Sequence, residues 1–422
     1  MAHLPSRPPR RIGRPSAAIA ISVVVAALAI GGSLLVGGRG ADPTPQGSSD
    51  PPAASVMAAP TPHPPPGHEV YGFVPYWEMD GSIAGHVAAT DATTIALFSV
   101  THTSRGALAT NQTGYKLITG PIGRRIIGDV HHRGGRVDVT YTSFGHEKNA
   151  RLFAAPAVQD KVIAGLVALR RELSADGIAV DVEEIDDTDV VAYGVFVGKL
   201  KLALRTDDPD ATLTVATTAG PQGAALAAAA NVAGADRIFL MGYDYRTGSS
   251  EPGASSPLAR RDGDERTLAW SLDLYAAAGV PVTRTLLGLP LYGVAWPTAS
   301  ADLGAAATGK GAVWVPRRNL ATLRDRTLTP VVDPVEVVAF LAVPDGTGWQ
   351  AIYYDTPETL IPKLALADDR GLAGAGLWAL GYERGMPAYT RLIAEFHGGR
   401  LPYVAAPSAS SLIDGLTPGP RT

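Results

Sequence analysis

Short apolar stretches alternate with helical patterns through residues 69–400. Eight stretches are rich in β-branched and aromatic residues and have the length of strands. They cover Val70–Trp77, Thr94–Val100, Arg136–Thr142, Gly177–Glu183, Thr212–Thr217, Arg237–Asp244, Arg284–Leu291 and Gly374–Leu380. Between several of them, apolar residues recur at helical spacing, over Ala157–Leu173, Asp189–Leu204 and Leu268–Ala278. This alternation predicts parallel strands joined by helical crossovers.

Eight strands in this arrangement predict an α/β fold, a closed (β/α)8 barrel of the TIM type. A chain of 422 residues is long enough for such a domain and for flanking segments. The alternative is an open, doubly wound sheet that binds a nucleotide. That fold carries a Gly-rich phosphate loop after its first strand, and no such loop follows Val70–Trp77. The barrel is therefore the favoured fold.

The spacing between the seventh and eighth strands is longer than the rest. Two further strand-like stretches lie there, Gly311–Pro316 and Gly348–Asp355. Asp333–Ala342 reads as a short helix, with Asp333 as N-cap and Pro334 at the first helical position. We therefore expect a small α+β insertion, at about residues 293–354, on the side of the barrel where the strands end. Thr359–Ala367 then forms the seventh helix.

The N-terminal segment predicts export. Residues 1–16 are basic, and residues 17–38 form an uncharged run about as long as the roughly 20 residues that cross a bilayer as a helix. The basic side is expected to stay cytoplasmic. The run is either an uncleaved transmembrane anchor, which its length favours, or a signal segment that is removed. The folded part is thus expected outside the cytoplasm, held by a single-pass anchor at the cell membrane or secreted.

Two further segments have the composition of linkers. Residues 39–68 are rich in proline, with Gly, Ser, Thr and Ala between, and cannot build a core. Residues 401–422 form a similar tail. The folded domain is accordingly expected to span residues 69–400.

Composition excludes several classes of function. The net charge is −4, and no basic run interleaved with aromatic residues occurs in the folded part, so we expect no nucleic-acid partner. The chain has no cysteine, which excludes disulfides, thiolate metal sites and a cysteine nucleophile.

The fourth strand carries two acidic residues on one face. Side chains alternate along a strand, so Ala179, Asp181 and Glu183 point one way while Ile178 and its apolar neighbours point the other. A buried carboxylate is costly unless it is paired or used. Active sites of such barrels lie at the C-terminal ends of the strands. This strand therefore predicts the floor of an active site.

Other polar and aromatic residues fall at the same ends of strands. They are Phe73, Tyr76, Trp77, Tyr243, Asp244, Tyr292 and Trp378. Aromatic rings stack on the faces of sugars, and carboxylic acids protonate glycosidic oxygens. Carboxyl groups and aromatics at one rim indicate a carbohydrate site. Tyr76 and Trp77 fit packing equally well.

Four motifs give a specific resemblance. Asp176–Glu183 (DGIAVDVE) is similar to the Asp-x-x-Asp-x-Asp-x-Glu signature of family 18 glycoside hydrolases, the chitinase-like enzymes. Met241–Asp244 (MGYD) resembles the Met-x-Tyr-Asp motif of strand six in that family. Gly288–Gly293 (GLPLYG) resembles its strand-seven motif, and Trp378 its strand-eight tryptophan. The resemblance covers about residues 69–395, with the motifs in the family's order.

The resemblance implies a substrate-assisted, retaining mechanism and a role for each matching residue. Glu183 is the acid and later the base, and Asp181 orients the substrate's 2-acetamido group. Tyr243 hydrogen-bonds the acetamide oxygen, and Asp244 holds the sugar and tunes Glu183. Trp378 forms the floor of the pocket, which Met241, Tyr292 and Phe73 line. No metal and no organic cofactor are implied, and we expect a monomer whose partner is an oligo- or polysaccharide containing N-acetylglucosamine.

One position departs from the family pattern. Ala179 stands where the family has its inner aspartate. Asp181 thus lacks its usual proton-sharing partner, and we expect altered pH dependence and lower turnover. Some relatives that act on peptidoglycan or spore coats also lack this aspartate. Chitin oligomers and peptidoglycan both remain candidate substrates.

Other interpretations of these residues remain open. The alternative to an enzyme is a non-catalytic, lectin-like barrel that binds chitin or peptidoglycan; a scaffold at the cell envelope is a weaker one. Retention of the acid Glu183 favours the enzyme.

The pair His131 and His132 lacks a third metal ligand at a useful spacing, and the acidic run after Glu183 lacks the glycine and spacing of a calcium loop.

Overall fold

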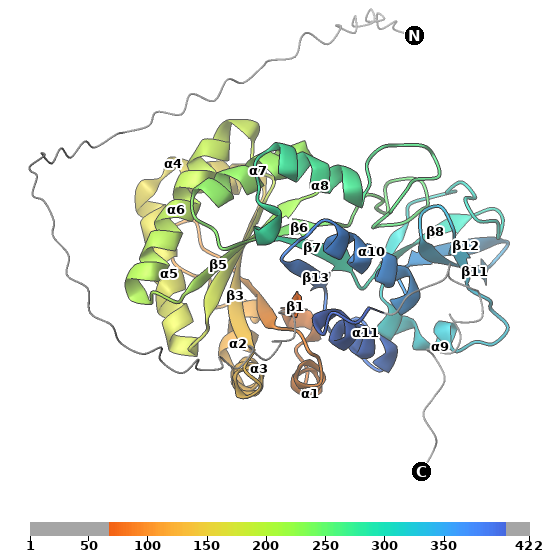
Figure 1. Ribbon diagram of the computed structural model, residues 1–422, viewed down its shortest axis with the longest axis horizontal. Coiled ribbons are helices and arrows are strands. Elements are labelled where there is room, and N and C mark those ends of the chain that lie inside the picture. The colour runs from red at the N-terminus through yellow and green to blue at the C-terminus, as the bar shows by residue number, and fades with distance from the viewer. Residues whose placement is uncertain (1–66, 402–422) are drawn as a thin grey trace, which may run out of the picture. The chain divides into compact units, whose positions relative to one another are not determined.

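The computed structural model describes residues 67–401, in which eight parallel strands close into a barrel (Figure 1). The order around the barrel is β1-β13-β7-β6-β5-β4-β3-β2. The strands are β1 (Glu69–Pro75), β2 (Thr94–Val100), β3 (Arg136–Phe144), β4 (Gly177–Glu183), β5 (Thr212–Thr218), β6 (Arg237–Met241), β7 (Thr285–Pro290) and β13 (Gly374–Trp378). All eight predicted strands are present, and the predicted TIM barrel is confirmed.

Helices surround the strands. They are α1 (Ile83–Ala88), α2 (Thr113–Thr119), α3 (Pro121–His132), α4 (His146–Ala154), α5 (Pro156–Leu173), α6 (Val190–Asp207), α7 (Pro221–Val232), α8 (Leu268–Ala277), α10 (Pro357–Asp369) and α11 (Pro387–His397). The sequence of α5 shows why a helix forms there. Pro156 occupies its first turn, and Val162, Leu166 and Leu169 form a buried stripe at helical spacing. The helix ends at Ser174, whose φ of 55° reverses the chain.

Strand alternation divides the side chains into two layers. The inward layer holds Tyr71, Phe73, Ala96, Phe98, Ala179, Ala216, Phe239 and Leu286. Outward side chains of the same strands, such as Ile178 and Val180 on β4, belong to the larger core shared with the helices. The predicted division of the fourth strand is therefore confirmed, with Ala179 inside the barrel.

The opposite, N-terminal end of the barrel holds a buried carboxyl group that the sequence did not reveal. Asp138 accepts hydrogen bonds from Tyr71 Oη at 2.7 Å and Thr214 Oγ1 at 3.2 Å, and its burial raises its pKa to about 6. A Cβ atom at Gly177 would collide with Asp138 and Thr212, so glycine permits close packing at the start of β4.

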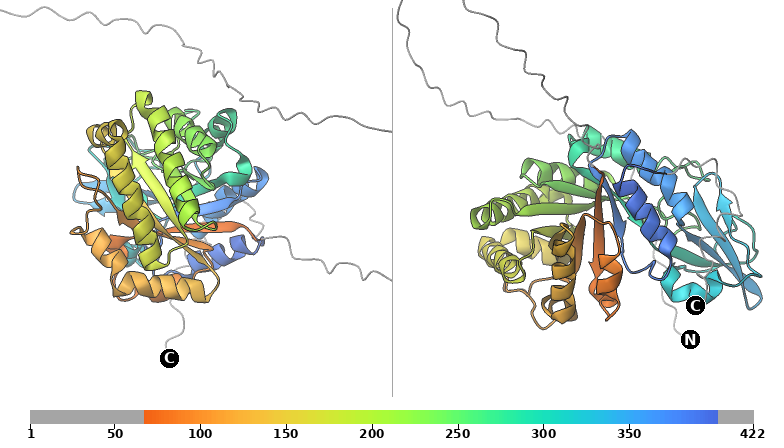
Figure 2. Two further views of the ribbon diagram at one scale, coloured as in Figure 1. Left: turned by 90° about the vertical axis from the view of Figure 1, so that its left-hand side faces the viewer. Right: turned by 60° about the horizontal axis from the view of Figure 1, so that its bottom comes forward.

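Between β7 and α10 the chain forms a second, antiparallel sheet in the order β10-β11-β12-β8-β9, which stands beside the barrel (Figure 2). Its strands are β8 (Gly293–Thr298), β9 (Ala312–Trp314), β10 (Val331–Asp333), β11 (Val338–Asp345) and β12 (Gly348–Tyr354), with the short helix α9 (Leu320–Leu323) between β9 and β10. The buried carboxylate of Glu336 accepts hydrogen bonds from the backbone N–H groups of Ala254 at 2.6 Å and Arg261 at 3.1 Å. These bonds connect the turn between β10 and β11 to the long loop between β6 and α8.

The helix predicted over Asp333–Ala342 is wrong. Asp333 does cap the backbone, since its Oδ1 accepts hydrogen bonds from Val335 N at 2.9 Å and Glu336 N at 3.1 Å, but it caps a turn between β10 and β11. Asp-Pro signals serve turns and helices alike. The following residues pack with a period of two, because Val338 and Phe340 face one cluster and Ala339 another. Pairing with β12 stabilises the strand.

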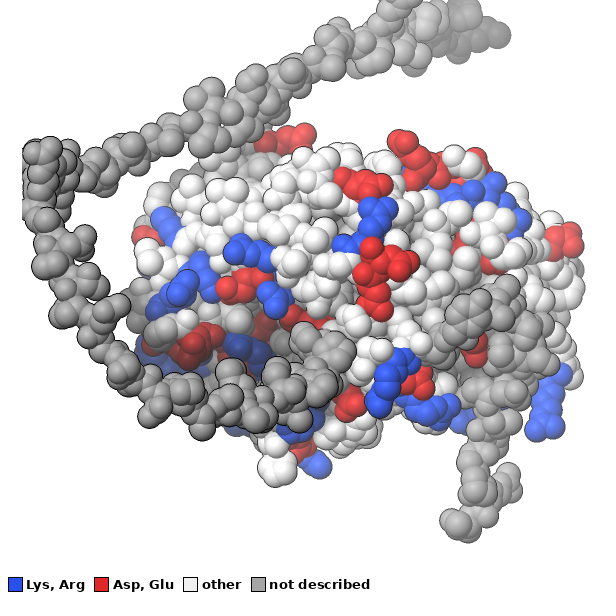
Figure 3. Space-filling model, in the orientation of Figure 1, with Lys and Arg blue, Asp and Glu red and all other residues white. Residues whose placement is uncertain are grey.

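Several predicted segments lie outside the described residues, namely 1–16, 17–38, most of the linker 39–68 and the tail from residue 402. Within residues 67–401, no single helix combines the length and the apolar character needed to cross a membrane, although the bent pair α4 and α5 meets both criteria together. On the face shown in Figure 3, basic and acidic side chains are interspersed.

Candidate active site

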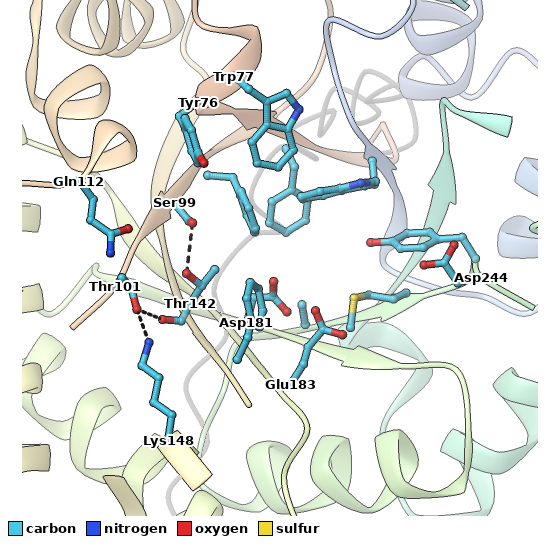
Figure 4. Close-up of a pocket in the computed structure, with 17 residues that line it drawn as sticks. Tyr76, Trp77, Ser99, Thr101, Gln112, Thr142, Lys148, Asp181, Glu183 and Asp244 are labelled. Carbon is cyan, nitrogen blue, oxygen red and sulfur yellow. Dashed lines mark hydrogen bonds between the residues drawn. The ribbon is translucent and has the colours of Figure 1, made fainter. Parts of the chain in front are cut away.

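The two acidic side chains of β4 lie in a cavity of about 480 Å³ at the C-terminal end of the barrel (Figure 4). Asp181 and Glu183 line it together with Tyr243 and Asp244, which follow β6. The cavity is also lined by Phe73, Tyr76, Trp77, Phe98, Ser99, Thr101, Gln112, Thr142, Phe144, Lys148, Ala216, Met241 and Trp378. Seven of the eight predicted site residues thus line one cavity. The eighth, Tyr292, lies behind Asp244.

Asp181 is the deeper of the two acids. It is only 6% exposed, and among the described residues its Oδ1 has no hydrogen-bond partner. Its neighbour on the same inward face of β4 is Ala179, which offers no polar atom. Burial, followed by the charge of Glu183, raises the pKa of Asp181 well above the usual value for an aspartate. Asp181 therefore ionises less readily than an exposed aspartate does.

Glu183 lies nearer the mouth of the cavity and is half-buried. Burial is the largest cause that raises the pKa of Glu183, and the charges of Asp244 and Glu184 add to it. A carboxyl group that keeps its proton at a higher pH than usual is suited to act as a general acid. Asn149 of α4 donates a hydrogen bond to the backbone carbonyl of Glu183 at 2.5 Å, which fixes the end of the strand.

The loop after β6 holds Asp244 in a left-handed conformation with a φ of 62°. The N–H of Asp244 donates a hydrogen bond to Ser255 Oγ at 3.0 Å, and Oδ1 accepts one from the phenol of Tyr292. Much of the residue faces solvent, but its carboxyl group is crowded by protein atoms. Burial raises the pKa of Asp244, and the bond from Tyr292 opposes that rise. Backbone strain of this kind is common at functional sites.

An aromatic cluster covers the side of the cavity opposite the acids (Figure 4). The ring of Trp378 lies 4.7 Å from that of Phe98 and 5.5 Å from that of Phe73, measured between centroids. Trp77 lies 6.3 Å from Trp378 and also lines the cavity, as does Tyr76. Tyr76 and Trp77 therefore contribute to the site rather than to packing alone. Their rings provide the apolar faces on which a sugar can stack.

Sequence reasoning missed a polar wall on the third side of the cavity. It consists of Ser99, Thr101, Gln112, Thr142 and Lys148, hereafter the polar wall. Ser99 and Thr142 come from the ends of β2 and β3, so the rule that places active sites at strand ends offered a signal for them. Lys148 comes from the first turn of α4, and no motif marked it.

A second cavity of about 410 Å³ lies on the other side of Glu183. Glu183, Met241, Tyr243 and Asp244 line both cavities. The second is completed by Thr218, Ala219, Gly220, Pro221, Tyr245, Arg266 and Trp270. The acid therefore lies between two spaces, each large enough for part of an extended ligand.

One residue of the acidic motif lies away from this site. Asp176, the first residue of the acidic motif, lies at the other end of β4, where its Oδ2 accepts a hydrogen bond from Val137 N at 2.7 Å and contacts His131 Nε2 at 2.8 Å. Its position indicates a structural role. Within residues 67–401, no group of three or more acidic, His or Cys side chains is arranged to hold a metal ion.

Comparison with protein families decides the class of this barrel. The model of Glycosyl hydrolases family 18 matches residues 137–383, which is more than half of the chain. The chain belongs to this family. The matched region begins in β3 and runs through the insertion sheet to Glu383, so it includes every predicted catalytic residue.

Curated family 18 proteins show local sequence similarity. Chitinase 63 of Streptomyces plicatus is 29% identical over 228 residues, which is 48% of this chain and 35% of that protein. Chitotriosidase-1 of Mus musculus is 28% identical over 160 residues, covering 34% of this chain and 33% of that protein. The chain thus spans about a third of the length of these relatives.

Solved structures share the fold over a longer range. The class V chitinase of Nicotiana tobaccum superposes with a TM-score of 0.67 at 18% identity, covering 79% of this chain and 99% of that chain. The spore cortex-lytic enzyme SleL of Bacillus cereus has a TM-score of 0.63 at 17% identity, covering 78% and 74% respectively. At these identities, the likeness supports the family 18 fold alone.

Proposed function

We propose that this chain is a glycoside hydrolase that cleaves β-1,4 bonds in glycans containing N-acetylglucosamine, either chitin oligomers or peptidoglycan. The observation that carries the proposal is the position of Glu183 between two cavities, with Asp181 beside it and aromatic rings opposite. Hydrolysis needs an acid at the bond that joins two sugars, and this arrangement leaves space for a sugar on each side.

Similar solved structures support the class of ligand. The class V chitinase of Nicotiana tobaccum has been solved with NAG4 and the family 18 chitinase of Cycas revoluta with (GlcNAc)3. The ligands are bound in those two proteins and not in this chain. They make an N-acetylglucosamine oligomer the first substrate to test here.

The proposed reaction is substrate-assisted and retaining. Glu183 donates its proton to the glycosidic oxygen, and the leaving sugar departs. The carbonyl oxygen of the 2-acetamido group attacks the anomeric carbon, which forms an oxazolinium ion. The acetamide N–H donates a hydrogen bond to Asp181, which favours the ionised form of this carboxyl group and lets it stabilise the positive charge that develops, while Tyr243 hydrogen-bonds the acetamide oxygen. Glu183 then removes a proton from water as the water oxygen bonds to the anomeric carbon. The bond between that carbon and the acetamide oxygen breaks, which restores the acetamide and retains the configuration.

Hydrolysis and binding assays together test this function. Wild type is expected to cleave an N-acetylglucosamine hexamer, and Glu183→Gln is expected to lose activity by roughly a hundred- to ten-thousandfold while still binding the hexamer. A wild type that binds the hexamer without cleaving it would instead support the lectin-like alternative. If wild type neither binds nor cleaves the hexamer, a peptidoglycan glycan strand is the next substrate.

A further inference from the structure

The polar wall of the active-site cavity contains a cation without an acidic partner. Lys148 is the only basic residue that lines the main cavity, and it is half-buried there. Its Nζ donates a hydrogen bond to Thr101 Oγ1 at 2.7 Å, and within residues 67–401 no carboxylate lies within ion-pairing distance of it. A partly desolvated ammonium group without a counterion is unfavourable in free energy.

The neighbours of Lys148 are fixed in a way that leaves its ammonium available. Thr101 Oγ1 donates to the backbone carbonyl of Thr142 at 2.7 Å, so toward Lys148 it acts as an acceptor. This bond uses one of the three N–H groups of Lys148. His102 lies nearby, and burial, with the charge of Lys148 as a second cause, lowers its pKa to about 4. His102 is therefore neutral at physiological pH and adds no second positive charge beside Lys148.

Burial also lowers the pKa of Lys148 itself. An anion in the cavity would offset that effect and favour the charged lysine. The second cavity differs in this respect. Its basic residue, Arg266, is held by Asp264, with Nε 3.0 Å from both carboxylate oxygens. Arg266 is thus neutralised within the protein, whereas Lys148 is not.

We infer that Lys148 binds a carboxylate on the glycan, so that the preferred substrate is an acidic N-acetylated amino-sugar polymer rather than neutral chitin. The inference rests on the proposed function, because it names the substrate class of the same site. A charge-assisted hydrogen bond from a lysine gives specificity for such a group. Two kinds of sugar carry such a carboxylate. One is N-acetylmuramic acid, through its 3-O-lactyl group, and the other is a hexuronic acid that alternates with N-acetylglucosamine.

Binding measurements in the Glu183→Gln background test the inference without cleavage. We expect the lactyl-bearing or the uronate-bearing oligomer to bind about tenfold more tightly than a neutral N-acetylglucosamine oligomer of equal length, which is the scale of one hydrogen bond to a charged group. The tighter of the two acidic ligands identifies the source of the carboxylate. Lys148→Met should remove the preference, and Lys148→Arg should keep it.

Two controls separate this result from general effects. Lys161→Met removes the same charge from an exposed position on α5, outside the cavity, and should keep the preference. Reducing the ligand's carboxyl group to an alcohol should abolish the preference in the unaltered Lys148 protein, whatever the folding of the variants. Equal affinity for acidic and neutral oligomers would overturn the inference while leaving the proposed function intact. Failure of the wild type to hydrolyse any of these glycans would instead overturn the proposed function.

Discussion

The phenol of Tyr292 donates a hydrogen bond to Oδ1 of Asp244, although one residue follows β7 and the other follows β6. This bond lowers the pKa of Asp244 against the effect of burial. The charge of Asp244 is in turn one of the causes that raise the pKa of Glu183. Tyr292, which does not itself line the cavity, is thereby linked to the acid through Asp244.

Replacing Asp244 by Asn should change the pH dependence of hydrolysis. Glu183 must carry a proton to act as the acid, so the rate falls as pH rises through its pKa. Without the charge of Asp244, the pKa of Glu183 is lower. The alkaline limb of the profile of kcat/KM against pH should therefore move to lower pH. Asp129→Asn, which removes the same charge from the exposed side of α3, should leave the limb in place. An unmoved limb in Asp244→Asn would contradict this coupling.

Tyr292→Phe tests the same coupling through Asp244. The substitution removes the hydrogen bond that favours ionised Asp244, so the pKa of Asp244 rises and its charge raises the pKa of Glu183 over a narrower pH range. The alkaline limb of kcat/KM should therefore move to lower pH, by less than in Asp244→Asn. We expect kcat/KM at neutral pH to fall about tenfold, the scale of one hydrogen bond to a charged group. A profile identical to that of wild type would show that the bond between Tyr292 and Asp244 has no catalytic effect.

Ala179→Asp tests the departure from the family pattern. Ala179 is fully buried and lies on the inward face of β4, next to the unpaired Oδ1 of Asp181. A carboxyl group there can share a proton with Asp181, so we expect kcat on an N-acetylglucosamine oligomer to rise. Extra atoms in a packed core cost about 1–3 kcal/mol, which should lower the free energy of unfolding.

Ala179→Val is the matched control, because it adds volume without a carboxyl group. It should cost similar stability and give no gain in kcat. If both variants change kcat equally, volume rather than proton sharing explains the effect.

The repeating strand pattern allowed the barrel and much of the site to be predicted from sequence. Ile178 and Asp181 show why. Period-two alternation places Ile178 on the strand face that packs against the helices and Asp181 on the face that points into the barrel. The predicted helix at Asp333 was wrong because a capping aspartate and a proline serve turns as well as helices. The polar wall was missed because Lys148 comes from a helix, and only the folded chain brings it to the ends of β2 and β3.

Breaking one buried ion pair on one side should strongly destabilise the fold. Lys363 of α10 lies 2.5 Å from Oδ1 of Asp355, which follows β12, and both side chains are almost fully buried. Lys363→Met leaves the carboxylate of Asp355 without its counterion. We expect the free energy of unfolding in urea to fall by about 3–5 kcal/mol.

The double variant Lys363→Met and Asp355→Asn should recover part of that loss, because no unpaired charge remains. Arg124→Met, which breaks an exposed pair with Glu172, is the comparison and should cost less than about 1 kcal/mol. A loss of similar size from the buried and exposed pairs would contradict this account.

The most direct test of the central claim is proton NMR of the first product formed from an N-acetylglucosamine hexamer. Attack by the substrate's own acetamido group, with Glu183 as acid and then base, requires that the new reducing end appear first as the β-anomer. We predict that β-anomer in wild type and no product signal on the same timescale in Glu183→Gln. Initial formation of the α-anomer, or undiminished cleavage by Glu183→Gln, would contradict the mechanism.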